Sequence, residues 1–237
     1  MRKWNFQAKG DRAATVRIYD EVGAGFFGGL TAKAFAEELD DLGAIDELSV
    51  RINSPGGSVF EGLAIYNTLL SHPAKVTVDI DGLAASIASI IAMAGDEVRM
   101  AKSAKMMIHN PWTIAIGDAA EMRKAADQLD GSRDSLLDIY AGRSSKSRAE
   151  LLAMMDDETW FGADAAKSAG LADTVIEGDM AIAALARGFD LSRFRHPPAD
   201  LKDPGPRGEM RGAVEASDAA QEVAVRLRLV DLQERSR

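Results

Sequence analysis

Apolar and polar residues alternate with a period of two in three separate stretches of the chain, 15–19, 48–52 and 76–80. This alternation predicts β-strands with one buried face. Residues 31–39 and 59–70 instead carry apolar side chains at helical spacing, which predicts two helices. Strands and helices therefore alternate along the chain, and this order predicts an α/β fold.

The pattern continues in the next part of the chain. Residues 84–94 are almost all Ala, Ile, Ser and Met, and we expect them to form a buried helix. Short strands are expected at 97–100 and 105–108. Apolar residues then recur at helical spacing from 118 to 141, while the other positions are heavily charged. A helix of this length and charge could project from the globule and pack against a partner subunit.

Two shorter helices, at 147–155 and 163–168, and a closing strand at 172–176 complete the predicted domain. We therefore place one domain at 1–178 and a C-terminal extension at 179–237.

The extension has a different character from the domain. The sequence His196-Pro197-Pro198 and the Pro- and Gly-rich stretch 203–208 are typical of a linker. One helix is expected at 180–186. Residues 214–237 fit either a helix or an alternating strand, and we favour a partly ordered helix. Because the Pro-rich stretches would separate the extension from the domain, we expect deletion after Gly178 to leave the domain folded.

Composition limits the classes of function. The 237 residues carry a net charge of −9 without any cluster of Lys and Arg, which argues against nucleic acid as a partner. There is no cysteine, which excludes disulfides, a thiolate nucleophile and a Cys-based zinc site. We expect no metal and no cofactor. The N-terminal residues do not resemble a signal peptide, and the apolar run near Ser86 is too short for a membrane span. We therefore expect a cytoplasmic protein with no membrane partner.

Ser86 is a candidate nucleophile. It lies at the start of the predicted small-residue helix, where free backbone N–H groups and the positive end of the helix dipole favour developing negative charge. Such a place suits a reaction that creates an oxyanion. The alternative is that Ser86 only caps a tightly packed helix.

Three other elements could converge on Ser86. His109 ends an apolar strand and could act as a general base, whereas the other two histidines lie in a loop and in the Pro-rich stretch. The turn 54–57, Ser-Pro-Gly-Gly, leaves backbone N–H groups unshielded and could stabilise an oxyanion. One acid of the run 156–158 could orient the imidazole. Each feature also has a purely structural interpretation, as a turn histidine, an ordinary turn and a group of surface acids.

Four blocks of the chain resemble, in order and in spacing, the signature blocks of the Clp-type serine peptidases. They are Arg-Ile-Asn-Ser-Pro-Gly-Gly at 51–57, Gly-Leu-Ala-Ala-Ser at 82–86, Met-Ile-His-Asn-Pro at 107–111 and Ala-Asp-Ala-Ala-Lys-Ser-Ala-Gly-Leu-Ala-Asp at 163–173. The resemblance covers about residues 15–177. The segment 18–23, together with the C-terminal extension, is more similar to the branch encoded by phages and prophages, whose members act as prohead or head-maturation proteases.

The resemblance implies a role for particular residues. It assigns Ser86 as the nucleophile and His109 as the general base. It assigns the backbone N–H groups of Gly57 and Ile87 as the oxyanion hole. The third catalytic position falls on Glu158, where the family usually has Asp, and the neighbouring Asp157 is the alternative.

The resemblance also implies an architecture. The family fold is a crotonase-like spiral of ββα units, with a projecting handle helix that corresponds to 118–141. Its subunits form a homo-oligomeric ring, and two rings can stack to enclose a chamber that protein substrates enter.

The sequence therefore predicts a serine endopeptidase that works through an acyl-enzyme, either ATP-independent or assisted by an ATPase. The branch implies that it cleaves capsid or scaffold proteins, in the host cytoplasm or in the prohead. One alternative is a catalytically decayed assembly scaffold. Another is a crotonase-like acyl-CoA hydratase or isomerase, which would need carboxylate bases and no reactive serine.

Overall fold

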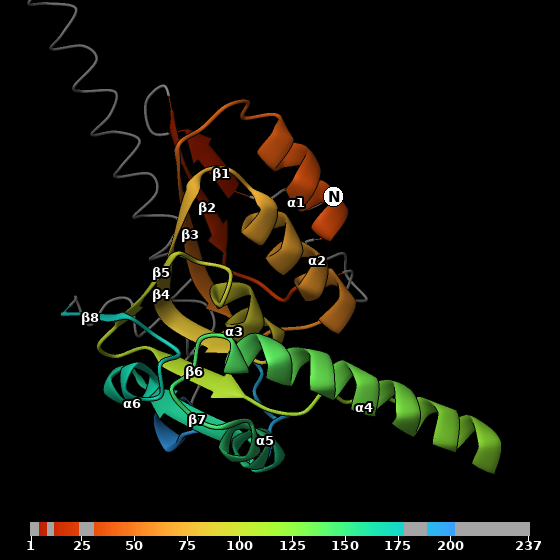
Figure 1. Cartoon of the computed structure of the whole chain (residues 1–237). Coiled ribbons are helices and arrows are strands. Elements are labelled where there is room, and N and C mark those ends of the chain that lie inside the picture. Colours follow the sequence, from red (N-terminus) through yellow and green to blue (C-terminus); the bar gives the residue numbers. More distant parts are fainter. Residues whose placement is uncertain (1–4, 9–11, 24–30, 178–188, 202–237) are drawn as a thin grey trace, which may run out of the picture.

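A computed structural model describes residues 5–8, 12–23, 31–177 and 189–201 (Figure 1). The strands are β1 Asn5–Ala8, β2 Ala13–Ile18, β3 Glu47–Ser54, β4 Lys75–Ala85, β5 Glu97–Ala101, β6 Lys105–Ile108, β7 Thr159–Gly162 and β8 Thr174–Ile176. The helices are α1 Ala32–Asp40, α2 Val59–Ser71, α3 Ile87–Ala92, α4 Ala119–Ala141, α5 Arg148–Asp156 and α6 Ala163–Ser168, and Ala199–Leu201 forms a short 3-10 turn. The predicted α/β class is confirmed.

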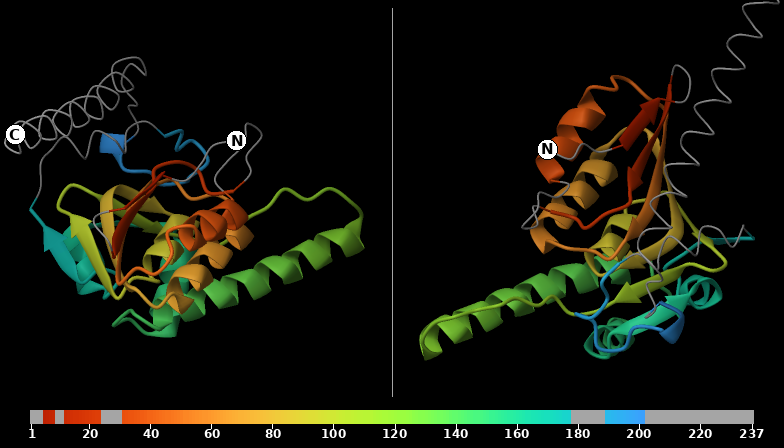
Figure 2. Two further views of the ribbon diagram at one scale, coloured as in Figure 1. Left: turned by 90° about the horizontal axis from the view of Figure 1, so that it is seen from above. Right: turned by 180° about the vertical axis from the view of Figure 1, so that it is seen from behind.

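The strands form one eight-stranded sheet in the order β1-β2-β3-β4-β5-β8, with β6 paired to β4 and β7 to β6. The pairs β2–β3, β3–β4, β4–β5, β5–β8 and β4–β6 are parallel. The pairs β1–β2 and β6–β7 are antiparallel. Helices α1 and α2 lie side by side against one face of the sheet (Figures 1 and 2). This arrangement follows from the sequence, since parallel strands need helical crossovers between them.

Strand β4 is the element from which the sheet branches. Its first half, residues 77–80, pairs with β5, and its last three residues, 83–85, pair with β6. The register of β3 against β4 shifts between Ile52 and Ser54, which lets β4 bend at this point. The end of β4 is therefore directed away from β5 and lies beside the end of β6.

The expected start of the small-residue helix was wrong. Ala84 and Ala85 belong to β4, and α3 begins at Ile87. The reason is that a run of small buried residues fits a buried strand as well as a buried helix, so periodicity does not separate the two. Here the ladder to Met106 and Met107 of β6 decides in favour of the strand.

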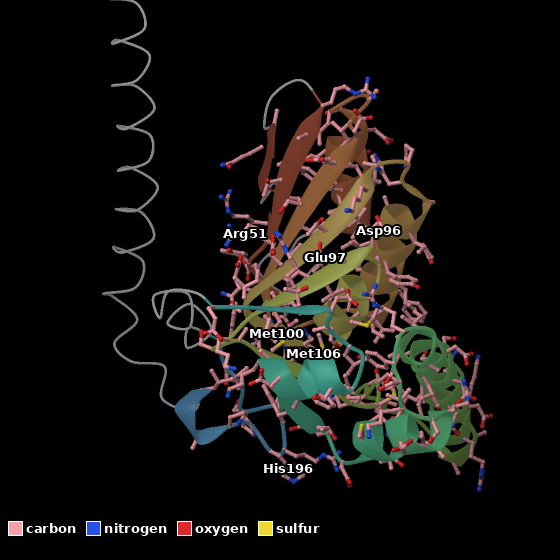
Figure 3. All side chains as sticks on the ribbon, turned by 60° about the vertical axis from the view of Figure 1, so that its left-hand side comes forward. Arg51, Asp96, Glu97, Met100, Met106 and His196 are labelled. Atoms are coloured by element: carbon pink, nitrogen blue, oxygen red, sulfur yellow. The ribbon has the colours of Figure 1, made fainter. Side chains whose placement is uncertain are left out.

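The two faces of the sheet differ in chemistry. The face toward the helices carries the core residues Val50, Ile52, Val78 and Ile80, each 1% exposed or less. The other face is polar, and Figure 3 shows Arg51 and Glu97 on it. Arg51 forms a two-pronged ion pair with Asp81 at 2.6 and 2.8 Å. Charges on this face are thus paired across neighbouring strands.

Helix α4 projects from the body of the molecule (Figures 1 and 2). Its buried residues, Leu136, Leu137 and Tyr140, all lie near its C-terminal end. A capping box formed by Asp118 and Glu121 closes the opposite end, in solvent. The predicted span of 118–141 therefore agrees with the observed helix.

Residues 189–201 pack against the domain rather than standing apart from it. Leu191, Phe194 and Leu201 are 5–6% exposed and lie in one cluster with Leu83, Ala85 and Met107. The sequence expectation of a separating Pro-rich linker does not describe this segment, because apolar residues on either side of His196-Pro197-Pro198 find partners on β4 and β6. The expected helices at 180–186 and 214–237 lie outside the described residues.

Within the described ranges, no helix is long and apolar enough to cross a membrane.

Two glycine substitutions test the packing of α2 on α3. Gly62 lies in α2, and a methyl group there would overlap the Ile87 side chain, whereas a methyl group at Gly131 in α4 would meet nothing within 4 Å. We expect Gly62→Ala to lower the free energy of unfolding by about 1–3 kcal/mol. We expect Gly131→Ala to raise it by about 0.5–1 kcal/mol, because alanine favours a helix. Urea denaturation measures both, and equal effects would contradict the described packing.

Candidate active site

Ser86 occupies the sharp turn between β4 and α3. Its backbone has φ 55° and ψ −129°, a conformation that costs a residue other than glycine about 1–3 kcal/mol. Its side chain makes no capping hydrogen bond to α3. The hydroxyl instead lies 2.8 Å from Nε2 of His109. The turn therefore presents the hydroxyl to the histidine, and the helix-cap interpretation of Ser86 does not describe the structure.

Buried hydrogen bonds hold this turn. The backbone N–H of Ser86 donates to the carbonyl of Met107 at 3.0 Å, which ties the turn to β6. The Ser89 hydroxyl lies 2.6 Å from the carbonyl oxygen of Ser86 and 2.7 Å from the hydroxyl of Tyr140 in α4. Both side chains are 1% exposed or less.

Sequence reasoning did not assign Ser89 and Tyr140 a role at the site. In the sequence, Tyr140 is only one of the apolar positions that recur along the long helix. Ser89 follows Ser86 by three residues, which is the spacing of a local side-chain-to-backbone bond and was the available signal.

His109 follows β6 directly and is 9% exposed. Burial lowers its pKa to about 4, the charge of Glu158 acts in the opposite direction, and the nearby Arg193 and Arg195 lower it further. The imidazole is therefore neutral at pH 7. A neutral ring at 2.8 Å from a hydroxyl is able to accept its proton.

The glycine turn predicted at 54–57 lies against Ser86. Gly56 has φ 92° and Gly57 has φ 148°. A methyl group at Gly56 would lie 2.8 Å from Cβ of Ser86, so only glycine lets the turn come this close. Val22 donates its N–H to the Gly56 carbonyl and accepts from the N–H of Ser58, both at 2.8 Å.

These bonds fix the turn but do not use the N–H of Gly57. Among the described residues, the N–H groups of Gly57 and Ile87 have no backbone acceptor. They are the two donors that the sequence analysis expects to form an oxyanion hole.

The three acids at 156–158 lie in different environments. Asp156 accepts from the side-chain amide of Asn110 at 2.7 Å, and the Asp157 side chain is exposed. Glu158 is 3% exposed and has φ 53°. It is also the acid whose charge acts on His109. Burial and the charge that acts on His109 thus favour Glu158 over Asp157 as the acid that influences the imidazole.

The Glu158 carboxylate is bound mainly by backbone. One oxygen accepts from the N–H of His196 at 2.7 Å and from the Trp160 indole at 3.2 Å, and the other accepts from the N–H of Arg195 at 2.8 Å. Burial raises its pKa, but these donors outweigh burial and hold the pKa below its usual value. In the part of the chain that the structure describes, no hydrogen bond joins Glu158 to His109. The carboxylate therefore acts on the imidazole through its charge.

A cavity of about 440 Å³ opens over Ser86 and His109. Its lining also includes Gly57, Ser58, Trp112, Ile114 and Phe194. Ser86 and His109 therefore both face this cavity rather than the core.

Comparison with known proteins agrees with this geometry. Residues 12–179 match the family described as Clp protease. The chain is 33% identical to the ATP-dependent Clp protease proteolytic subunit of Bacteroides fragilis over 151 residues, which cover 62% of this chain and 73% of the relative. It is 34% identical to the same subunit of Deinococcus radiodurans over 141 residues, 59% of this chain and 69% of the relative. With proteolytic subunit 1 of Protochlamydia amoebophila the identity is 32% over 163 residues, 67% of this chain and 78% of the relative.

The pKa of His109 predicts a dependence of stability on pH. Between pH 6.5 and 4 the unfolded chain binds a proton on this residue and the folded chain does not, so acid favours unfolding. The loss of unfolding free energy between pH 7.5 and pH 5 should be about 2 kcal/mol larger in the parent than in His109→Gln. Urea denaturation at the two pH values measures the difference, and equal losses would contradict a buried neutral imidazole.

Proposed function

The chain belongs to the Clp protease family and is a serine-type peptidase, and we propose that Ser86 is its nucleophile. The observation that carries this assignment is the 2.8 Å contact between the Ser86 hydroxyl and Nε2 of His109 at the mouth of a cavity. A strained serine beside a neutral imidazole is the arrangement that nucleophilic acyl transfer needs.

The proposed reaction uses the described residues in sequence. His109 accepts the proton of the Ser86 hydroxyl as the oxygen attacks a peptide carbonyl carbon. The N–H groups of Gly57 and Ile87 donate to the oxyanion of the tetrahedral intermediate. His109 then gives its proton to the leaving amine, which leaves an acyl-enzyme on Ser86. Water, deprotonated by the same imidazole, hydrolyses the ester and restores the serine.

Glu158 has an electrostatic role in this proposal. During attack the imidazole becomes positively charged in a buried place, which is costly without a nearby anion. The hydrogen bonds to Glu158 keep its carboxylate ionised, so its negative charge is available when the imidazolium forms. The longer side chain of Glu, relative to the usual Asp of the family, is compatible with this role.

We further propose that the protein is an endopeptidase that works as a ring-shaped homo-oligomer. The exposed N-terminal half of α4 extends away from the body and supports packing of this helix against another subunit. Stacking of two rings would use the same helix. The relatives are named as subunits of ATP-dependent proteases, which supports assistance by a separate ATPase for folded substrates.

The finer role in phage head maturation is likewise a proposal. It is supported by the resemblance of residues 18–23, and of the presence of a C-terminal extension, to the prohead protease branch. Capsid or scaffold protein would then be the substrate. Coexpression with such a protein, followed by comparison of its cleavage by the parent and by Ser86→Ala, tests this role.

Substitution of the nucleophile tests the peptidase assignment. We expect Ser86→Ala to lower kcat for a short fluorogenic peptide, assayed without nucleotide, by at least about a thousandfold. A fluorophosphonate probe should label the parent at Ser86, as located by mass spectrometry, and should not label the variant. Ser103→Ala, at an exposed position remote from the cavity, is the control.

Two results would exclude a serine peptidase at this site. One is hydrolysis by Ser86→Ala at the parental rate. The other is a parent that neither reacts with the probe nor cleaves peptide, which would favour the decayed scaffold or the hydratase.

The oligomer is tested separately through α4. Met122 is 37% exposed near the outer end of this helix. If it packs against another subunit, Met122→Asp should convert the oligomer to smaller species in native mass spectrometry, because a charge would be buried at the contact. Lys124→Asp, on the same exposed half of the helix, is the comparison for the change of charge. A parent that is monomeric at micromolar concentration would contradict the ring.

A further inference from the structure

The segment 189–201 crosses the candidate active site. Its Phe194 is 6% exposed, and its ring meets the imidazole of His109 edge to face, with centroids 5.7 Å apart and planes at 72°. The same ring meets Trp160 of β7 at 5.7 Å and 82°. Phe194 therefore packs between the proposed base and the strand that follows the acidic run.

The two residues after Phe194 bind the acid. The backbone N–H groups of Arg195 and His196 donate to the two oxygens of Glu158, at 2.8 and 2.7 Å. The Arg195 guanidinium also donates to the carbonyl of Asp156 at 2.6 Å, which fixes this part of the segment to the acidic run. Figure 3 shows His196 at the edge of the molecule, and its side chain is exposed. Its main chain, rather than its imidazole, makes the contact with Glu158.

The residue before Phe194 binds the opposite side of the cavity. Arg193 forms an ion pair with Glu21 at 2.5 Å and donates to the carbonyl of Pro55 at 3.2 Å. Pro55 belongs to the turn that carries Gly57. Residues 193–196 thus connect the turn 54–57, the His109 ring and the Glu158 carboxylate.

We propose that residues 189–201 are a working part of the peptidase site, in which Phe194 positions the His109 ring and the N–H groups of Arg195 and His196 position the Glu158 carboxylate beside it. The proposal rests on the proposed function and adds positioning residues that lie beyond the family match, which ends at residue 179. These residues act through His109 and Glu158.

The physical argument begins with Glu158. A buried carboxylate without donors would be protonated or would turn toward solvent. Apart from Trp160, its hydrogen-bond donors in the described structure come from this segment. The segment therefore keeps a negative charge in a fixed place beside the imidazole, where it stabilises the positive ring formed during attack.

Phe194 acts on the imidazole of His109. Its ring covers one edge of His109 and excludes water from it, which contributes to the burial that lowers the pKa of the imidazole. The charged groups that act on the imidazole are Glu158, Arg193 and Arg195. Removal of the aromatic ring leaves all three charges in place, so its effect on the pKa of His109 comes from solvent access.

Phe194→Ala in the full chain tests the first half of the proposal. We expect kcat for the fluorogenic peptide to fall on the order of tenfold, since a less constrained imidazole is less often aligned with Ser86. The acid limb of the kcat/KM profile should move from near pH 4 toward 6.5 as water reaches the ring. Phe194→Leu, which keeps an apolar cover, should restore most of the rate and most of the profile.

A matched pair at His196 tests the second half without changing the aromatic cover. Pro has no N–H, so His196→Pro removes the donor to Glu158, while His196→Ala removes the same imidazole and keeps the donor. We expect His196→Pro to lower kcat on the order of tenfold with little change in KM, because charge stabilisation acts in the transition state. The fall in kcat should be distinctly smaller in His196→Ala, so the difference between the two variants measures the loss of the N–H donor.

The outcomes separate this proposal from the proposed function. If the parent reacts with fluorophosphonate at Ser86 and all four variants keep the parental kcat and pH profile, the segment is only a cover and the proposal is overturned. A kcat above the parental value in Phe194→Ala or His196→Pro would also overturn it, since the segment would then restrain Glu158 from His109. Failure of the parent to react would count against the peptidase itself. Thermal unfolding identifies any variant that does not fold. If one fails at position 194, the pair at position 196 tests the proposal, and the reverse holds for a failure at position 196.

Discussion

The pairing of β4 with β6 is the constraint on which the candidate site depends. Ala85 lies opposite Met107 in this ladder, and the N–H of Ser86 donates to the Met107 carbonyl one step further on. The serine and the histidine thus leave two neighbouring strands at the same edge, with the hydroxyl 2.8 Å from the ring nitrogen. A shift of one residue in this register would turn the side chains of one strand to the opposite face. The first half of β4 pairs with β5, so β4 has to bend before its last three residues can pair with β6.

The surrounding structure stabilises a conformation that Ser86 alone would avoid. The Ser89 hydroxyl donates to the carbonyl of the strained residue and is itself paired with the hydroxyl of Tyr140, which comes from the base of the projecting helix α4. Helix α4 therefore links the proposed subunit contact, at its outer end, to the turn of the proposed nucleophile, through Tyr140 and Ser89. On the opposite side, Gly56 lets the turn 54–57 approach Ser86 more closely than a residue with a side chain could. Backbone strain at a reactive serine is typical of a site whose rigid surroundings compensate for it.

Much of this arrangement could be predicted from the sequence, and the reasons for the failures are physical. Alternation, short apolar runs and helical spacing indicated α4 and six of the eight described strands, but not β1 or β7, and four short blocks indicated Ser86, His109 and the glycine turn. The start of α3 was misplaced because buried alanines fit both strand and helix. The placement of 189–201 was missed because its Pro-rich pattern describes only local backbone preference. Its binding partners for Glu158 are backbone N–H groups, which every sequence contains, so no residue type could have indicated them.

The central claim is that the imidazole of His109 activates the hydroxyl of Ser86. The most direct measurement is the rate at which a fluorophosphonate probe modifies Ser86 as a function of pH, in the parent and in His109→Gln. We expect a rate that rises with an inflection near pH 4 in the parent and is at least about a hundredfold lower in the variant. Equal rates in the two proteins, with no inflection below pH 7, would contradict it.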